Sequence, residues 1–237
     1  MKIENSMILG GFQKLTLLDY PGKIAATVFT LGCSFRCPFC HNPELVDLRL
    51  AHNEESEKEF FDFLKKRKGK LEGVCITGGE PTIQPDIIDF IKKIKEMGFL
   101  VKLDSNGTRP DVLKKIFDQK LVDYVAMDIK SDLDNYEKVV GTKIDKDRIR
   151  LSVNLIRNSR IPYEFRTTVV PGLHEEKDFL EIAKWISGAQ AYYLQEYRED
   201  QKILDPNLKK VTKGKSLDLE KIRKMIEKNF DKIEIRR

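Results

Sequence analysis

The sequence predicts an α/β fold in which about six β–α units form a partial (βα)6 barrel, TIM-like and with parallel strands. The first observation behind this prediction is alternation. Apolar runs rich in β-branched residues alternate strictly with helical patterns, as in a parallel sheet with right-handed crossovers. The second is placement, because every chemical motif falls at the carboxyl end of a predicted strand, and in a barrel those ends meet at one mouth. A doubly wound open sheet is the alternative that alternation alone also allows.

The elements follow one another along the chain, and an early segment, 8–18, is expected to add a short strand or hairpin at the barrel edge. The predicted strands are the apolar, β-branched runs 24–31, 73–77, 99–103, 124–129, 163–170, 191–197 and 232–235. The predicted helices are 54–67, 85–97, 110–119, 146–158, 175–187 and 217–229.

Local signals support several of these boundaries. The first helix is amphipathic, with three apolar residues on one face: Phe60, Phe61 and Leu64. Gly98 closes the second helix, and Pro110 stands at an early position of the third. Pro171 and Gly172 stop the fifth strand.

Length and composition indicate a single domain, 1–237, with a core of about 12–197, the N-terminal edge extension and a C-terminal helix and strand. The 237 residues suffice for one large domain, and no linker or repeat interrupts them. Charged residues make up 34%, which describes a globular protein with a highly charged surface. The net charge of +5 is spread along the chain, and the densest basic run, 65–70, ends a helix, where cations suit the dipole. No nucleic-acid partner is therefore expected.

The sequence also predicts a compartment. The first residues lack the apolar stretch of a signal peptide, and no apolar run approaches membrane-spanning length, so no membrane partner is expected. Four cysteines in a three-plus-one layout do not fit a secreted disulfide scaffold. A reducing cytoplasm is the expected location, and it suits thiolates that bind a metal.

The most informative motif is C-x3-C-x2-C, formed by Cys33, Cys37 and Cys40 directly after an apolar strand. Three thiolates on one loop can hold three irons of a [4Fe–4S] cluster and leave the fourth iron open. The spacing also matches a Cys3His zinc site with His41, a dithiol redox pair and covalent haem attachment. Covalent haem attachment requires export of the protein, and a dithiol redox pair gives Cys33 no role. From the spacing alone, zinc is therefore the main alternative to the iron–sulfur cluster.

Polar and glycine residues close the strands that follow the cysteines. They are Gly78, Gly79 and Glu80 after the second strand, Asp104 and Asn106 after the third, Asp128 and Lys130 at the end of the fourth, and Arg166 in the fifth. Glycines let a ligand approach the backbone, and a carboxylate suits an ammonium group. Taken alone, these are a tight turn, an Asn-Gly turn and an exposed ion pair. Their recurrence at successive strand ends indicates one site.

These motifs, with Phe39 before the last cysteine, resemble the radical S-adenosylmethionine superfamily over roughly residues 12–197. Within it, the segments 40–42, 104–107, 128–130 and 166–172 are similar to the activating enzymes of glycyl-radical proteins. The opening segment 11–22 is most similar to the longer type of anaerobic ribonucleoside-triphosphate reductase activating protein, and pyruvate formate-lyase activating enzyme is the next relative.

The resemblance implies a reaction. A reduced [4Fe–4S] cluster cleaves S-adenosylmethionine to methionine and a 5′-deoxyadenosyl radical, and this radical takes a hydrogen atom from a glycine of a partner enzyme. Anaerobic ribonucleoside-triphosphate reductase is the expected partner, and a flavodoxin or ferredoxin the expected electron donor. The cofactor then supplies the chemistry, while the protein orients it and excludes water.

The resemblance also implies roles for single residues. The iron ligands are Cys33, Cys37 and Cys40, and the methionyl ammonium is received by Gly78, Gly79 and Glu80. Lys130 meets the methionyl carboxylate, ribose or the methionyl end is contacted by Asp104 and Asn106, and Phe39 packs on adenine. A monovalent cation is shared by Asp104 and Asp128, and Arg166 anchors the cofactor or lines the access for the glycine loop. One departure is Gln195, because pyruvate formate-lyase activating enzyme has a histidine in that stretch.

Three alternatives stay open beside this reading. They are activation of pyruvate formate-lyase or another glycyl-radical enzyme, a radical enzyme acting on a small molecule, and a zinc-binding module without catalysis. Two further residues carry expectations of their own: Cys75, inside the second strand, is expected to be buried packing, and His174 is expected to lie at the surface.

Overall fold

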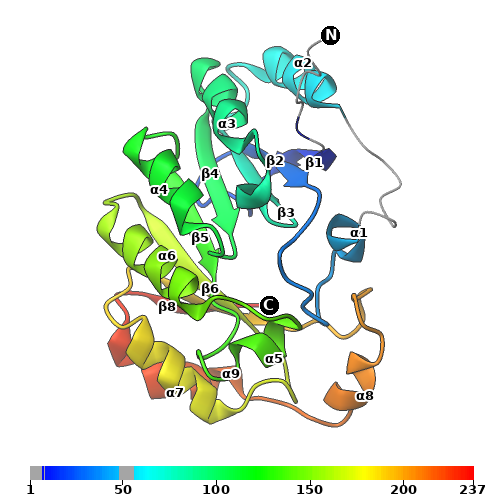
Figure 1. Cartoon of the computed structure of the whole chain (residues 1–237), viewed down its shortest axis with the longest axis vertical. Helices are drawn as coiled ribbons and strands as arrows, with labels where there is room; N and C mark the ends of the chain where they lie inside the picture. The colour runs from blue at the N-terminus through cyan, green and yellow to red at the C-terminus, as the bar shows by residue number, and fades with distance from the viewer. Residues whose placement is uncertain (1–6, 8, 48–55) are drawn as a thin grey trace.

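The computed structural model describes residues 7, 9–47 and 56–237, and its main feature is one eight-stranded sheet (Figure 1). The strands are β1 (Leu9–Thr16), β2 (Ala25–Thr30), β3 (Gly73–Gly78), β4 (Leu100–Ser105), β5 (Tyr124–Asp128), β6 (Tyr163–Val169), β7 (Tyr192–Glu196) and β8 (Ile233–Arg236). They lie side by side in chain order. β1 pairs antiparallel with β2, and the later neighbours pair in parallel.

The strand order decides between the two predicted architectures. A doubly wound sheet reverses its order at a switch point, whereas a barrel adds each new strand on the same side. The order from β1 to β8 does not reverse, and β1 and β8 form the two edges. The fold is therefore a partial barrel, as predicted, and β1 is the extra edge strand expected from segment 8–18.

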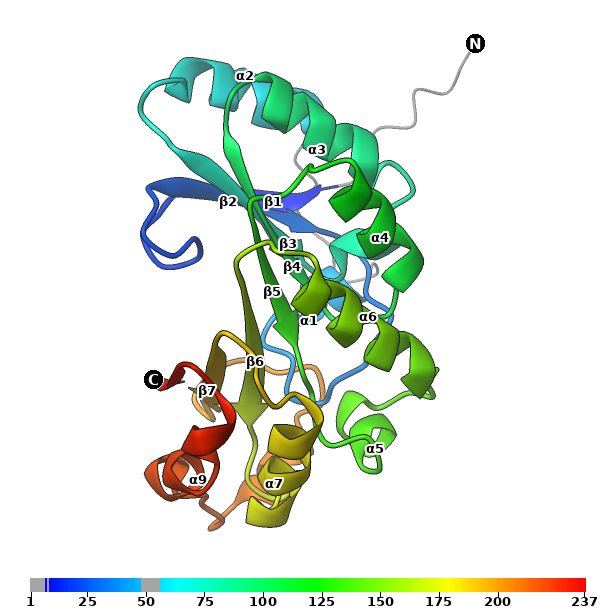
Figure 2. The ribbon, with the colours of Figure 1, turned by 90° about the vertical axis from the view of Figure 1, so that its left-hand side faces the viewer.

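Helical segments connect the strands in the described part of the chain. They are α1 (Pro43–Val46), α2 (Glu57–Arg67), the 3-10 helix η2 (Pro81–Ile83), α3 (Ile87–Glu96), α4 (Pro110–Asp118), α5 (Tyr136–Val140), α6 (Lys146–Asn158), α7 (Glu176–Trp185), α8 (Leu208–Thr212), α9 (Leu219–Ile226) and the 3-10 helix η3 (Glu227–Asn229). Figure 1 shows α3, α4 and α6 along one side of the strands, with α1 and the cysteine loop on the other. Figure 2 shows α7 and α9 packed together near β6 and β7.

The predicted helices are present with small shifts in their ends. Helix 54–67 begins at Glu57, where Ser56 and Glu59 form a capping box, and residues 54 and 55 lie outside the described residues. The short helices α1, α5 and α8 were not predicted, because four or five residues carry too little periodicity to be recognised. In the part of the chain that the structure describes, every helix is too short or too polar to cross a bilayer.

The two faces of β4 show how the sheet divides its side chains. Val101 and Leu103 are fully buried, and they alternate with Lys102 and Asp104. Because successive side chains of a strand point to opposite faces, the apolar pair packs toward the outer helices and the charged pair points into the barrel. Asp104 lines a cavity at the carboxyl ends of the strands. The barrel interior is therefore charged near the mouth.

Candidate active site

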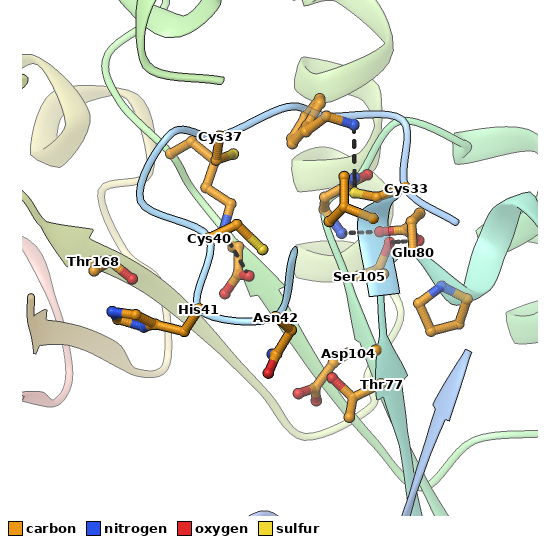
Figure 3. A pocket seen from close by; sticks show the side chains of 18 of the residues that line it. Cys33, Cys37, Cys40, His41, Asn42, Thr77, Glu80, Asp104, Ser105 and Thr168 are labelled. Atoms are coloured by element: carbon orange, nitrogen blue, oxygen red, sulfur yellow. Dashed lines mark hydrogen bonds and ion pairs between the residues drawn. The ribbon is translucent and has the colours of Figure 1, made fainter. Parts of the chain in front are cut away.

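One cavity collects the predicted site residues. It lies at the carboxyl ends of the parallel strands, and Figure 3 shows the cysteines on one loop beside the ends of β3 and β4. All the residues predicted for the site line it: Cys33, Cys37, Phe39, Cys40, Gly78, Gly79, Glu80, Asp104, Asn106, Asp128, Lys130 and Arg166. The lining also includes residues that sequence reasoning did not assign to the site: Phe35, His41, Asn42, Val46, Thr77, Pro81, Ser105 and Thr168.

Backbone hydrogen bonds from three directions hold the loop that carries the cysteines. Gly32 N donates to Leu45 O at the end of the loop (2.7 Å), and Arg36 N donates to Val140 O of α5 (2.9 Å). On the third side, two residues of the segment after β7 bind the loop. Leu204 N donates to Cys40 O and Asp205 N donates to Pro38 O, both at 3.0 Å. The positions of the three thiols are thus set by elements far apart in the sequence.

The cysteines are free thiols, of which Cys37 is buried and Cys33 and Cys40 are half-buried. Burial raises the pKa of Cys33 to about 11 and that of Cys37 to about 12, and it also raises the pKa of Cys40. Positive charge is needed to stabilise three thiolates here at neutral pH. Phe35 N lies 3.4 Å from the sulfur of Cys33, and such an N–H donor stabilises a thiolate. The donor set and its surroundings fit an iron–sulfur cluster.

His41 turns away from the cysteines. Its ring stacks on Tyr197, with centroids 5.8 Å apart, and its Nε2 donates to Arg198 O at 3.2 Å. Among the described residues, no three His, Cys, Asp or Glu side chains converge closely enough to hold a single metal ion. In this arrangement His41 connects the cysteine loop to the segment after β7.

Gly78 and Gly79 bring the end of β3 against the end of β2 and the start of the cysteine loop. Gly79 N donates to Thr30 O at 2.9 Å, and Glu80 N donates to Gly32 O at 2.8 Å. A Cβ on Gly79 would collide with the carbonyl group of Gly32, whose carbon would lie 2.6 Å away. The sequence prediction was that the glycines admit a ligand. What the structure shows is that Gly79 lets the backbone of the cysteine loop approach, while Gly78 lies against the backbone of Thr30 at the end of β2.

Glu80 is buried and its carboxylate already has protein partners. Oε1 accepts hydrogen bonds from the backbone and hydroxyl of Thr82 and from the hydroxyl of Ser105 (2.9 Å). Oε2 accepts one from the backbone of Asn106 (2.6 Å). Burial raises the pKa of Glu80 although these donors oppose the shift. The side chain thus ties the end of β3 to the end of β4, a function that the sequence did not reveal.

Four charged residues form a network across the ends of β4, β5 and β6. Arg166 Nε lies 2.9 Å from Asp128 Oδ1, and Arg166 Nη1 lies 3.1 Å from Asp104 Oδ2. Lys130 Nζ lies 2.9 Å from the other oxygen of Asp128. Burial by itself would raise the pKa of Asp128, but Arg166 and Lys130 outweigh it and hold that pKa well below its usual range. Both carboxylates are therefore ionised at neutral pH.

Lys130 and Phe39 stand together on the cavity wall. The Lys130 ammonium lies 5.8 Å from the centroid of the Phe39 ring, within the range of a cation–π contact. Lys130 also lowers the pKa of Cys37, in opposition to burial. The cavity thus offers a cation and an aromatic face close to the thiols. Gln195 is not among the described residues that line the cavity, whereas its register partner Thr168 is.

His174 was predicted to lie at the surface, and this prediction was wrong. Its side chain is buried, and both ring nitrogens have hydrogen-bond partners there. Val170 N donates to Nδ1 (3.0 Å), and Nε2 donates to Lys130 O (2.8 Å). Both ring nitrogens are thus used, which fixes the neutral form. The ring connects the loop after β6 to the backbone of a cavity residue.

His174 should make the folded state sensitive to acid. Burial lowers its pKa below the usual value of 6.5, so the unfolded chain binds a proton that the folded chain rejects. The stabilisation is complete above pH 6.5 and is lost as the pH falls below it, by up to about 1.4 kcal/mol per pH unit. Denaturant unfolding of the wild type and of His174→Gln between pH 7.5 and 5 measures this. We expect a shallower pH dependence in the variant, and equal slopes would contradict the prediction.

Cys75 is buried, as predicted, but its surroundings are polar. Its sulfur lies 3.7 Å from Lys102 Nζ and 3.8 Å from Asp104 Oδ1. Sequence reasoning missed Lys102, although a lysine within an apolar strand, two residues before Asp104, was a usable signal.

Comparison with known proteins gives consistent matches. The family model of the Radical SAM superfamily matches residues 27–186. A candidate glycyl-radical enzyme activating enzyme of Methanocaldococcus jannaschii is 34% identical over 235 residues, which cover 97% of this chain and 95% of that protein. The pyruvate formate-lyase-activating enzyme of Clostridium pasteurianum is 30% identical over 181 residues, covering 73% of this chain and 74% of the enzyme.

Solved structures show the same fold. Streptococcus suis SuiB bound to S-adenosylmethionine aligns with a TM-score of 0.65 at 15% sequence identity. The alignment covers 87% of this chain and 48% of SuiB, so the chain spans about half the length of that protein.

Proposed function

The chain belongs to the radical SAM superfamily, within its group of glycyl-radical enzyme activating enzymes, and we propose that its cavity uses a [4Fe–4S] cluster and S-adenosylmethionine to form a glycyl radical on a partner protein. One observation supports this most directly: three free thiols of one loop face the same cavity as the charged strand ends. When bound, the reduced cluster supplies the one-electron cleavage of S-adenosylmethionine to methionine and the radical that takes hydrogen from glycine.

The residues of the chain bind and orient the reactants. Cys33, Cys37 and Cys40 are proposed as the iron ligands, and with three protein ligands a [4Fe–4S] cluster would keep one iron available to the methionyl group. Lys130 suits that carboxylate, because its ammonium lies on the cavity wall close to Cys37. Phe39 offers an apolar face to the adenine. Holding the sulfonium beside the cluster in one orientation lowers the barrier by several kcal/mol.

The strand ends are proposed to hold the rest of the cofactor. The backbone of Gly78 and Gly79 suits the methionyl ammonium, and the buried Glu80 contributes negative charge nearby while its oxygens stay bound to the protein. Asn106 suits ribose or the methionyl end. A monovalent cation between Asp104 and Asp128 remains a proposal, and it would share those carboxylates with Arg166.

The proposed partner is anaerobic ribonucleoside-triphosphate reductase, on the similarity of segment 11–22. Pyruvate formate-lyase is the second candidate, because activating enzymes of that name are up to 30% identical to this chain in the matches above. A flavodoxin or ferredoxin is the proposed reductant. A single domain in a reducing cytoplasm is the proposed setting, since thiolate ligands of a cluster survive best where thiols stay reduced.

Anaerobic reconstitution with iron and sulfide tests the proposal. We expect a brown protein with about four irons per chain, whose reduced spin signal changes when S-adenosylmethionine is added. Zinc uptake without cluster formation would reject the enzymatic function. The loaded protein is then mixed with each partner under reduction. We expect a glycyl-radical signal with the reductase, and a signal with pyruvate formate-lyase alone would transfer the assignment to the second candidate.

A further inference from the structure

Lys102 is a buried cation to which the proposed function assigns no role. It lies in the middle of β4 with 1% of its surface exposed, and it is not among the residues that line the cavity. Its ammonium forms an ion pair with Asp104 Oδ1 and lies 3.7 Å from the sulfur of Cys75 on the neighbouring strand. Burial lowers the pKa of Lys102, but Asp104 and Cys75 outweigh burial and raise it, so the amine is charged at neutral pH.

Asp104 divides its two carboxylate oxygens between two cations. Oδ1 faces Lys102 below the cavity, and Oδ2 faces Arg166 Nη1 at 3.1 Å. Arg166 in turn uses Nε to bind Asp128, at 2.9 Å. With Lys130 on Asp128, five side chains of alternating charge run from inside the barrel to the cavity wall. Lys102 is one inner end of this network, and the buried Glu164, whose Oε1 lies 3.9 Å from Arg166 Nη1, is another.

Lys102 affects how the Arg166 guanidinium divides its hydrogen bonds between Asp104 and Asp128. A buried carboxylate needs compensation for both of its oxygens, and Lys102 supplies it for Oδ1. Without Lys102, Arg166 is the remaining cation in contact with Asp104 among the described residues. The guanidinium can satisfy both oxygens by binding Asp104 in the bidentate manner that such pairs favour. That rotation withdraws Nε from Asp128.

We propose that Lys102 is a positioning residue that holds Arg166 between Asp104 and Asp128, and thereby sets the charge along the cavity wall where S-adenosylmethionine binds. This inference rests on the proposed function for the identity of the ligand. It acts through Asp104 and Arg166, since Lys102 itself does not reach the cavity.

The first test needs no cofactor. In a crystal structure of Lys102→Met, we expect the Arg166 guanidinium to turn toward Asp104 and its Nε to leave hydrogen-bond distance of Asp128. A guanidinium that still bridges both carboxylates would overturn the proposal, whatever ligand the protein binds. If Lys102→Met does not fold, the double variant Lys102→Met/Asp104→Asn removes the pair together, and Arg166 should then bind Asp128 alone.

The second test measures ligand affinity in the reconstituted protein. We expect Lys102→Met to raise the Kd for S-adenosylmethionine about tenfold with unchanged iron content, and Lys102→Arg, which keeps the charge, to recover part of the loss. The matched control is Lys95→Met, which removes another ion pair, to Asp123 at 2.7 Å outside the cavity, and should leave the Kd unchanged.

The affinity of a double variant distinguishes a positioning role of Lys102 from a general structural effect. If Lys102 acts through Asp104, the double variant should bind about as weakly as Asp104→Asn alone, since contacting residues are not additive. Additive losses would contradict the proposal. If the wild type with a complete cluster does not bind S-adenosylmethionine, the proposed function fails, whereas the position of Arg166 in the first test still decides the role of Lys102.

Discussion

Replacing Cys37 by alanine is expected to abolish cluster assembly and the formation of 5′-deoxyadenosine. Cys37 is buried, with 7% of its surface exposed, whereas Cys33 and Cys40 are half-buried, so solvent ligands have little access to replace the sulfur of Cys37. A cubane held by two remaining thiols has lost a third of its protein ligands. Iron content after anaerobic reconstitution and chromatography of the cleavage products measure the effect, and product formation should fall below detection.

Cys75→Ala is the control for the loss of a buried thiol. Cys75 is even less exposed than Cys37 but lies within β3, in contact with Lys102 and Asp104. We expect this variant to keep its iron and most of its activity, with a loss of unfolding free energy of about 1 kcal/mol. If it lost iron to the same extent as Cys37→Ala, the assignment of the three loop cysteines as the complete ligand set would be wrong.

Replacing Gly79 by alanine should both destabilise the protein and displace the cysteine loop. The new methyl group would collide with the carbonyl of Gly32, and backbone atoms cannot rotate out of the way as a side chain can. The hydrogen bond from Glu80 N to Gly32 O, 2.8 Å long, must then open. Overpacking of this kind costs about 3 kcal/mol or more, which is roughly 6–12 °C in Tm for a chain of this length.

The iron content of the reconstituted protein should show the same displacement of the cysteine loop. We expect Gly79→Ala to reconstitute with less iron, because Gly32 immediately precedes Cys33. Gly98→Ala is the matched control. Gly98 has a positive φ of 90° and no atom within 4 Å of an added Cβ, so this variant adds backbone strain of about 1–2 kcal/mol without a collision. Equal iron contents in the two variants would show that the contact between Gly79 and Gly32 does not position the cluster loop.

The sequence was sufficient to locate the site because the relevant signals are local. Hydrophobic periodicity identified the strands, and their alternation with helices required a parallel sheet. Parallel strands put their carboxyl ends at one edge, so Cys33, Glu80, Asp104 and Lys130 could be assigned to one mouth before any contact was known. The placement in one cavity followed from topology, while the chemical roles of these residues stay proposals.

The contacts inside that site were decided by the tertiary structure. Arg166 and Asp104 are separated by 62 positions in the chain, and β5 lies between their strands. His174 was assigned to the surface because a loop histidine gives no sign that Val170 N and Lys130 O will enclose it. A carboxylate such as Glu80 looks free in the sequence, since two of its hydrogen-bond donors, the Ser105 hydroxyl and Asn106 N, come from the end of β4.

The chain by itself thus determined the strands, the longer helices and which residues end at the mouth, because periodicity and strand direction are properties of neighbouring residues. Only the folded structure decided which charges share a partner and which polar atoms are already satisfied. Those outcomes depend on strand register and on side-chain reach between segments distant in sequence, such as Lys102, Arg166 and Asp128.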